Sequence, residues 1–413
     1  MNDVRMGTRT PVRKQKPSVP QQTQKQNPHI KPAKPHFKFQ GNERLAKFDM
    51  PLFIVTIVLL VFGGVMLLSS SFFFAGREHD GDSYHYFYSQ VTFMGIGLAA
   101  LIVISFIDYR ILMKPKIVAM LSGASVIMML AVKMGLGVTQ GGAERWLGIG
   151  SLVFQPSEIM KFALIILLAY IAHKHSNYLK TFKGFLLFCF IIAIACGLTI
   201  WQPHLSGTII MAGIGLTLMI ISNVKFRYVF IACAGAVLIG MFVLNVMESM
   251  GFTYFEDRFL SWHNPEADIQ DKTFQTYQSL VAIGSGGWFG LGLGNSRQKF
   301  SYLPATHNDF IFSVICEELG FVGGTLVLLL FVIFVLRGFY IASRARDRFG
   351  IMVAVGITSQ IGIQAFLNIA VVTNSVPNTG ITLPFFSYGG TALVMLMAQI
   401  GVLLNISRKA RIE

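Results

Sequence analysis

A series of long apolar stretches is the feature that most constrains how this chain can fold. Each stretch is close to the roughly 20 residues that cross a bilayer as a helix. Of the 413 residues, 53% are apolar and only 13% are charged, whereas soluble domains usually carry about 25% charged residues. The composition therefore excludes a soluble cytosolic protein, a disordered chain and a small disulfide-stabilised domain. It predicts a polytopic membrane protein.

Ten of these stretches are predicted to be transmembrane helices, so the predicted fold class is an all-α integral membrane protein. Every backbone polar group in lipid needs an internal partner, and the sequence lacks the alternating ten-residue strand pattern of a membrane barrel. The fourth to sixth stretches are short or marginal. The predicted spans are about 50–72, 88–107, 117–134, 158–173, 185–201, 208–222, 228–247, 310–336, 351–372 and 388–406.

Residues 1–47 differ in composition from the rest of the chain. This segment is rich in Gln, Pro, Lys and Arg, and it contains eleven basic residues. It cannot bury enough apolar surface to offset its chain entropy, so we expect a disordered tail. It also lacks the apolar core and cleavage site of a signal peptide. Two interpretations are open, a solvated tail near anionic lipids and a docking segment for a partner; no folded motif supports nucleic-acid binding.

The distribution of basic residues between successive loops predicts the orientation of the chain. If the tail is cytoplasmic, the loops on the same side carry fifteen Lys and Arg residues against three acids. An excess of this kind marks the cytoplasmic side. Residues 48–407 are then the membrane domain, and 408–413 are a short cytoplasmic C-terminus. The fifteen basic residues are Arg110, Lys114, Lys116, Lys174, Lys180, Lys183, Lys225, Arg227, Arg337, Arg344, Arg346, Arg348, Arg408, Lys409 and Arg411.

The longest predicted outer loop, about 248–309, separates the seventh and eighth spans. A long loop with little apolar content is usually functional, and this one contains more ionisable residues than any other loop. The second-longest outer loop, about 135–157, contains Glu144, Arg145 and Trp146. We therefore expect the functional site on the outer face.

Several charged residues lie at the outer ends of predicted spans, where charge is costly unless it is paired or lines a cavity. Glu158 and Lys161 are three residues apart, close enough to pair on one helix, so a structural ion pair and a site role are both open. Asp309 follows Pro304 and His307 at the mouth of the eighth span. Its carboxylate can stay accessible there while the low dielectric raises its pKa, which is typical of a catalytic group.

These residues alone leave two classes of function open. An outward-facing carboxylate flanked by Arg and Lys suits an anionic substrate that arrives from the lipid phase. The protein is then either a membrane transferase that acts on a phosphate-activated lipid or a transporter that moves one. No motif indicates nucleotide hydrolysis, so transport would depend on an ion gradient or on the gradient of the substrate itself.

Six ordered motifs over residues 48–407 resemble the SEDS proteins (shape, elongation, division and sporulation). The form of the fourth motif is more similar to the branch of FtsW and SpoVE than to the RodA branch. The motifs are GGAERW at 141–146, FQPSEIMK at 154–161, YQSLVAIGSGG at 277–287, GLGNSRQKFSYLP at 292–304, HNDFIF with EELG at 307–320, and GITLPFFSYGG at 380–390.

The resemblance implies a ten-span peptidoglycan glycosyltransferase that polymerises lipid II at the outer face of the cytoplasmic membrane. A flippase that moves the same lipid is the alternative. The resemblance also implies that Asp309 is the catalytic residue, acting as a general base on the 4-hydroxyl of the acceptor sugar. The residues expected to bind substrate are Arg145, Glu158, Lys161, Arg258, Gln278, Arg297, Gln298, Lys299, His307 and Ser387.

Partners and location follow from the same resemblance. A class B penicillin-binding protein is the expected transpeptidase partner, together with other cell-division proteins, at the septum during division or sporulation. The leaving diphosphate would be stabilised by outer Arg and Lys side chains or by a divalent cation, Mg²⁺ or Mn²⁺. One departure concerns the family sequence QPDLGT, which appears here as QPHLSGT at 202–208, with His204 in place of the acid.

Overall fold

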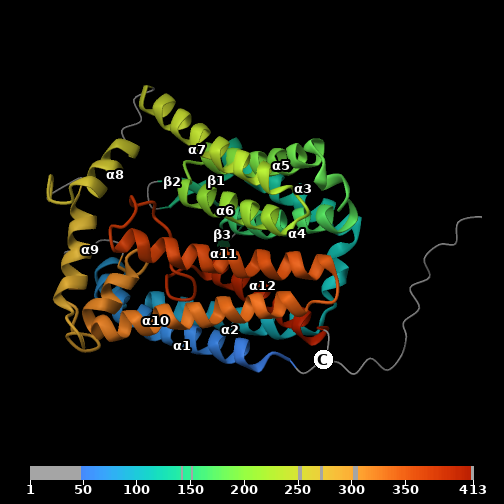
Figure 1. Cartoon of the computed structure of the whole chain (residues 1–413). Helices are drawn as coiled ribbons and strands as arrows, with labels where there is room; N and C mark the ends of the chain where they lie inside the picture. The colour runs from blue at the N-terminus through green and yellow to red at the C-terminus, as the bar shows by residue number, and fades with distance from the viewer. Residues whose placement is uncertain are drawn as a thin grey trace, which may run out of the picture. The chain divides into compact units, whose positions relative to one another are not determined.

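The computed structural model describes residues 48–140, 143–149, 152–249, 254–269, 273–300 and 306–410. The predicted tail, residues 1–47, lies outside the described residues, as do residues 411–413 at the predicted C-terminus. The described part is mostly helical (Figure 1). The predicted fold class, a helical membrane protein, is confirmed.

Ten helices coincide with the ten predicted spans. Eight of them are long and apolar enough to cross a membrane, whereas α6 and the apolar part of α7, Phe226–Leu238, are shorter. A multi-pass membrane protein is therefore confirmed, and the count of ten crossings stays a prediction. The ten helices are α1 (Met50–Glu78), α2 (His85–Phe106), α3 (Pro115–Ala131), α4 (Pro156–Lys174), α5 (Phe182–Trp201), α6 (Leu205–Ile221), α7 (Phe226–Ser249), α10 (Ile311–Arg344), α11 (Arg348–Val372) and α12 (Gly390–Arg408).

Acidic residues at the ends of the spans explain where two of these helices begin. The Asp49 carboxylate accepts a hydrogen bond of 3.0 Å from the backbone N–H of Leu52 and so caps α1. It also accepts two bonds of 3.1 Å from the guanidinium of Arg337, which ties the start of α1 to α10. Asp347 caps α11 in the same way, through a bond of 2.8 Å from the N–H of Gly350.

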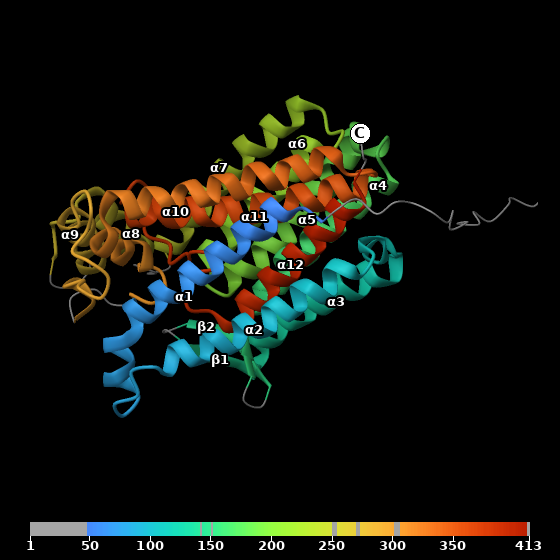
Figure 2. The same ribbon diagram turned by 90° about the horizontal axis from the view of Figure 1, so that it is seen from below.

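Helix α11 is the most enclosed part of the bundle. Of the residues in its most apolar stretch, 72% are buried, whereas the corresponding share is 22% in α2 and 22% in α3. Helices α4, α6 and α10 pack against α11, while α2 lies along α12 and α1 packs against α10 (Figure 2). Large apolar side chains remain exposed on α2 and α3, as is usual for helices that face lipid.

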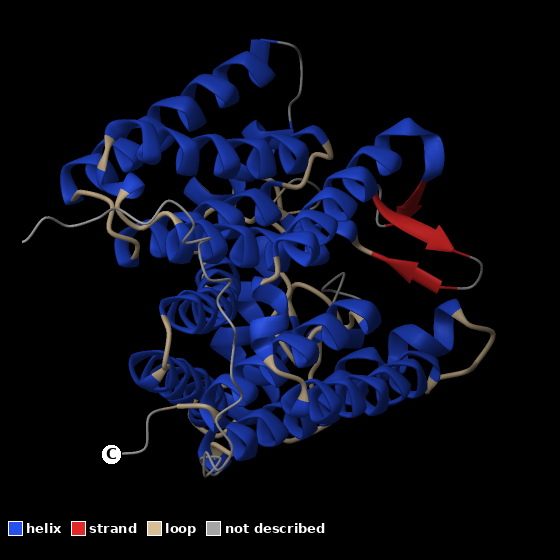
Figure 3. Cartoon of the chain, turned by 90° about the vertical axis from the view of Figure 1, so that its right-hand side faces the viewer, coloured by secondary structure: helices blue, strands red, loops and turns tan. Residues whose placement is uncertain are grey.

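Two segments that were predicted to be outer loops contain structure that the sequence did not predict. The predicted loop 135–157 holds a three-stranded antiparallel sheet of β1 (Gly137–Gln140), β2 (Ala143–Ile149) and β3 (Leu152–Phe154), shown in red in Figure 3. The predicted loop 248–309 holds α8 (Tyr254–His263) and α9 (Phe274–Ser285), which lie together at one end of the bundle in Figures 1 and 2. The short helical turns are η1 (Tyr109–Met113), η2 (Val132–Leu136), η3 (Tyr178–Lys180) and η4 (Gln298–Phe300).

Helix α10 is interrupted near its N-terminal end, at Gly320, where φ is +67° and ψ is −166°. The glycine-rich segment 287–292, which follows α9, docks into this break. Its backbone supplies partners for the helical N–H and C=O groups that the break would otherwise leave without one. The four bonds run from Leu291 N to Glu317 O (2.9 Å), from Gly292 N to Glu318 O (3.0 Å), from Phe321 N to Gly287 O (2.8 Å) and from Val322 N to Trp288 O (3.1 Å).

Candidate active site

A cavity of about 510 Å³ lies among the N-terminal ends of several helices. Its described lining comes from the starts of α2, α4, α6 and α12, from the residues before α10, from the middle of α11, from β2 and β3, and from residues 380–389. The first turns of helices carry unpaired N–H groups and the positive end of the helix dipole, so this lining favours an anion. The predicted site residues that line it are Arg145, Glu158, Lys161, Asp309 and Ser387.

The backbone around Asp309 is held by neighbouring polar side chains. Asn368 on α11 donates from Nδ2 to the carbonyl oxygen of Asp309 (2.8 Å). Ser387 donates from Oγ to the carbonyl oxygen of Asn308 (2.6 Å). On the cavity side, a Cβ atom placed on Gly380 would lie 3.2 Å from Oδ2 of Asp309. The two hydrogen bonds hold the backbone of residues 308 and 309 at the cavity wall, and the carboxylate lies next to Gly380, which has no side chain.

The environment of Asp309 makes its carboxyl group unusually basic. Burial raises its pKa to about 6, from a usual value of 3.8, although the positive charges of Arg258 and Arg145 act in the opposite direction. Desolvation is the larger effect because the charged form loses its water contacts. A carboxylate with this pKa is ionised at neutral pH and can accept a proton, as a general base must.

Glu158 and Lys161 form an ion pair on the first turns of α4, with Nζ 2.8 Å from Oε2. The side chain of Lys161 is only 2% exposed, and its Nζ also donates to Oε1 of Gln364 (3.3 Å). Gln364 in turn donates from Nε2 to the carbonyl oxygen of Thr382 (3.1 Å). The pair thus links α4, α11 and the residues before α12, and both members also line the cavity.

Arg145 reaches the cavity from β2 and contacts the turn before α6. Its Nη2 donates to the carbonyl oxygen of Pro203 (2.6 Å). The next residue, His204, also lines the cavity, with Nε2 3.3 Å from the side-chain nitrogen of Gln155. Burial and the charges of Arg145 and Lys161 lower the pKa of His204 to about 3. The imidazole is therefore neutral. Arg145 and Lys161 face an uncharged ring at position 204, where the family sequence has an acid.

The other six predicted site residues are not among the described residues that line the cavity. Arg258 on α8 donates from Nη1 to the carbonyl oxygen of Asn378 (2.7 Å), close enough for its charge to act on Asp309. Gln278 is half-buried on α9, and the Arg297 side chain is exposed. The six residues are Arg258, Gln278, Arg297, Gln298, Lys299 and His307.

His307 lies in an aromatic cluster beside the cavity. Its ring stacks on Tyr86 of α2, with centroids 4.7 Å apart, and lies 4.9 Å from the ring of Phe74 on α1. Burial lowers its pKa to about 4, against a smaller opposing effect of Glu78. His307 is thus a neutral, packed residue two positions before Asp309.

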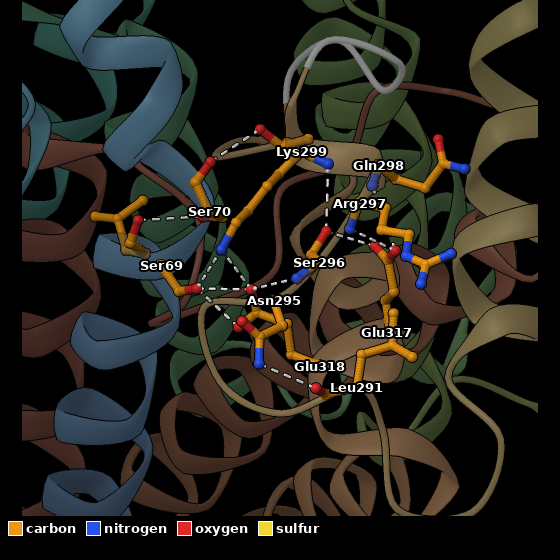
Figure 4. Close-up of polar contacts among 12 residues, drawn as sticks. Ser69, Ser70, Leu291, Asn295, Ser296, Arg297, Gln298, Lys299, Glu317 and Glu318 are labelled. Atoms are coloured by element: carbon orange, nitrogen blue, oxygen red, sulfur yellow. Dashed lines mark hydrogen bonds and ion pairs between the residues drawn. The ribbon is translucent and has the colours of Figure 1, made fainter.

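Lys299 lies in a buried polar cluster between α1 and α10 (Figure 4). Its Nζ contacts Oε1 of Glu318 at 2.7 Å and Oγ of Ser69 at 3.1 Å. Glu317 next to it accepts a bond of 2.8 Å from the N–H of Arg297. Only 7% of Lys299 is exposed. The cluster holds the segment after α9 against both helices.

The sequence matches the model of the FtsW/RodA/SpoVE family, described as cell cycle proteins, over residues 50–412. This chain belongs to the FtsW/RodA/SpoVE family. The match includes every described helix from α1 to α12. The family resemblance of the sequence motifs is therefore confirmed.

Two relatives of this protein have a similar length. Stage V sporulation protein E from Bacillus subtilis is 40% identical over 368 residues, which cover 88% of this chain and 98% of the relative. A protein from Geobacter metallireducens named probable peptidoglycan glycosyltransferase FtsW is 35% identical over 382 residues, covering 91% and 98% of the two chains.

Solved structures share the fold of this FtsW/RodA/SpoVE protein. The rod shape determining protein RodA from Thermus thermophilus matches with a TM-score of 0.64 and 25% identity, covering 89% of this chain and 98% of RodA. A chain in the structure titled "Structural coordination of polymerization and crosslinking by a peptidoglycan synthase complex" matches with a TM-score of 0.71 and 24% identity. That match covers 87% of this chain and 98% of the other.

Three polar residues of α11 in this family member were missed by sequence reasoning. Gln360 and Gln364 line the cavity, and Asn368 holds Asp309. They are four residues apart along an apolar span, so they share one helix face. Amides at this spacing inside a predicted membrane helix indicate a polar surface. That pattern could have been found in the sequence.

Proposed function

We propose that this protein is a peptidoglycan glycosyltransferase that polymerises lipid II at the outer face of the cytoplasmic membrane. The names of the two curated relatives, a sporulation protein and a probable peptidoglycan glycosyltransferase, support this function. The observation that carries the proposal is the position of Asp309, a carboxylate of raised pKa on the wall of a cavity that Arg145 also lines.

In the proposed reaction, Asp309 removes the proton from the 4-hydroxyl of the acceptor sugar. The oxygen then attacks the anomeric carbon of the donor, and the bond from that carbon to the lipid diphosphate breaks. The diphosphate leaves with the bonding electron pair, and the proton remains on Asp309 until solvent removes it. A diphosphate is a good leaving group without protonation, so one dominant carboxylate is sufficient.

Positive groups of the cavity would stabilise the charge that develops on the diphosphate. Arg145 and the N-terminal turns of α4, α6 and α12 supply such groups. Lys161 contributes less, because Glu158 already neutralises it. The neutral His204 beside Arg145 leaves the guanidinium without an acidic competitor at that position.

A divalent cation is an alternative counter-charge that the lining can accommodate. Mg²⁺ is usually bound by one or two carboxylates together with substrate phosphates. Among the described lining residues the carboxylates are Asp309 and Glu158, of which Glu158 is paired with Lys161. Asp309 could hold such a cation only in place of its role as the base, because a bound cation would lower the pKa of the carboxylate. Within the described segments no group of three or more His, Cys, Asp and Glu residues gathers to hold a metal.

The proposal includes an orientation and a partner. The excess of Lys and Arg in alternate loops supports cytoplasmic termini; with that orientation the cavity would lie on the outer face. A class B penicillin-binding protein would crosslink the strands made here, with other cell-division proteins at the septum. The fold shared with a chain from a peptidoglycan synthase complex is compatible with such a partner. Division and sporulation are both open as the process served.

The pKa of Asp309 predicts how polymerisation depends on pH. A general base acts only when it is deprotonated, so kcat/KM should rise about tenfold per pH unit below about pH 6 and level off above it. Initial rates on lipid II between pH 4.5 and pH 8.5 measure this. The variant His204→Gln should keep the same acidic midpoint, whatever its rate, because His204 is neutral throughout this range. A midpoint that moves with His204→Gln would contradict the assignment to Asp309.

The function itself is tested with the purified full-length protein, with and without the partner transpeptidase. Incubation with labelled lipid II should give glycan strands whose length grows with time, in the presence of penicillin and of moenomycin. Labelled lipid II in one leaflet of vesicles that contain the protein tests the alternative. Movement of the label between leaflets without any glycan product would instead support the flippase.

A further inference from the structure

Three described residues before Asp309, at positions 300, 306 and 307, contact the last turns of α1. Thr306 donates from Oγ to the carbonyl oxygen of Ser70 (3.1 Å). The ring of Phe300 packs on Phe73, with centroids 5.1 Å apart. The third contact is that of Phe74 with His307.

A fourth contact is ionic and is also largely buried. Ser69 of α1 donates from Oγ to the Glu318 carboxylate, with 2.7 Å to each oxygen. Lys299 donates to the same carboxylate and to Ser69, so these three side chains join α1, α10 and the segment after α9 (Figure 4). Glu318 is 0% exposed and Lys299 is 7% exposed. A buried carboxylate is tolerated only with such partners.

The position of Lys299 does not fit the substrate-binding role expected from its motif. It is not among the described residues that line the cavity, and its ammonium group is directed toward Glu318 and Ser69. Its backbone is also fixed, through a bond of 3.2 Å from its N–H to Oγ of Ser296. A cation held this way has lost the freedom to meet a diphosphate.

We propose that Lys299 is a positioning residue for Asp309: by binding Glu318 and Ser69, it holds residues 296–300 and the start of α10 against α1. The inference rests on the proposed function and assigns Lys299 a role in placing the base rather than in binding substrate. Residues 306–309 are then located from two sides. Asn368 and Ser387 fix them toward α11 and α12, and α1 fixes them from the other side.

The decisive variant is Lys299→Met, which keeps most of the length of the side chain and removes its charge. Small displacements of a catalytic group can cost up to about 100-fold in rate, so we expect kcat to fall between about 10- and 100-fold. The KM for lipid II should change less than about twofold, because the contacts that bind the substrate equally in the ground state and in the transition state are unaffected. A raised KM with an unchanged kcat would mean that Lys299 binds substrate, and it would overturn the proposal.

Two further variants separate positioning from a general loss of stability. The double variant Lys299→Met/Glu318→Gln should recover part of the lost kcat, since it removes the unpaired buried charge that the single change leaves. Arg337→Met breaks a less buried ion pair, which joins α10 to Asp49 at the start of α1. It should leave kcat within about twofold of wild type even where it lowers the Tm. An equal kcat loss in Arg337→Met, or no recovery in the double variant, would contradict the proposal.

A milder variant and a measurement without substrate complete the test. Thr306→Val removes one hydroxyl contact to α1 and should lower kcat in the same direction, by less than Lys299→Met. Hydrogen exchange at residues 306–310 should become faster in Lys299→Met and stay unchanged in Arg337→Met. Because this readout needs no activity, it tests the contact even if the wild-type protein polymerises nothing, which would refute the proposed function alone. Unchanged exchange in Lys299→Met would overturn the positioning role.

Discussion

Asp309→Asn should lower the rate of lipid II polymerisation by about 10²- to 10⁴-fold, the usual contribution of a positioned general base. The amide has the size of the carboxylate but cannot accept a proton at neutral pH. The loss should appear mainly in kcat, because the substitution removes an interaction made in the transition state. Initial rates with the purified protein and its partner measure the effect.

The fold of this variant is expected to remain intact. Burial raises the pKa of Asp309 above that of an unfolded chain, so its ionised form is less favourable in the folded protein above about pH 6. A neutral Asn should therefore keep the Tm at pH 8 or raise it slightly. Normal insertion and Tm together with near-normal glycan chains would refute Asp309 as the base. A collapsed Tm would show instead that the carboxylate has a structural role.

Gly290→Ala should destabilise the protein far more than Gly294→Ala, although both glycines have positive φ values, of +79° and +83°. A Cβ on Gly290 would overlap the carbonyl group of Glu318 and the N–H of Leu319, whereas no described atom lies within 4 Å of a Cβ on Gly294. The Gly294 variant should cost only left-handed backbone strain, about 1–2 kcal/mol. The Gly290 variant also displaces the segment from the break in α10.

Displacement would break four hydrogen bonds to α10, each worth about 0.5–1.5 kcal/mol net, unless each segment re-forms its own i to i−4 bonds. With the backbone strain added, the total loss for Gly290→Ala is then up to about 8 kcal/mol. Thermal unfolding in detergent, followed by tryptophan fluorescence, compares the two variants with wild type. Equal Tm losses in the two variants would show that strain alone matters and that the docking does not stabilise the protein.

The helices were predictable because lipid imposes a simple rule on sequence. A span must be apolar for about 20 residues and must satisfy its own backbone, so both its existence and its approximate bounds are local properties. The predicted span 351–372, for example, is nearly the observed helix Arg348–Val372. The small sheet in 137–154 was missed because its strands are three to seven residues long and belong to a loop predicted from polarity alone.

The candidate site was predictable only in part, because a cavity is a property of tertiary packing. Local sequence indicated Asp309 and the spacing of Glu158 and Lys161, and all three line the cavity. The motif that suggested Asp309 also suggested His307, and the motif before it suggested Lys299; both residues pack against α1. Sequence spacing does not tell whether a basic side chain points to a cavity or to a buried partner. Ser69, which Lys299 contacts, is 230 positions away in the sequence.

The docking of 287–292 into α10 also has a consequence for the order in which this protein folds. In an uninterrupted α-helix, the N–H of residue 321 would bond to the C=O of 317, and that of 322 to 318. The same i to i−4 spacing separates residues 291 and 292 from 287 and 288. In the observed structure, these N–H groups bond to the C=O groups of the other segment instead of their own. The number of these hydrogen bonds is the same in both arrangements. Helix α10 can therefore enter the membrane continuous and fully bonded, and we expect it to open at Gly320 only when the chain before it arrives.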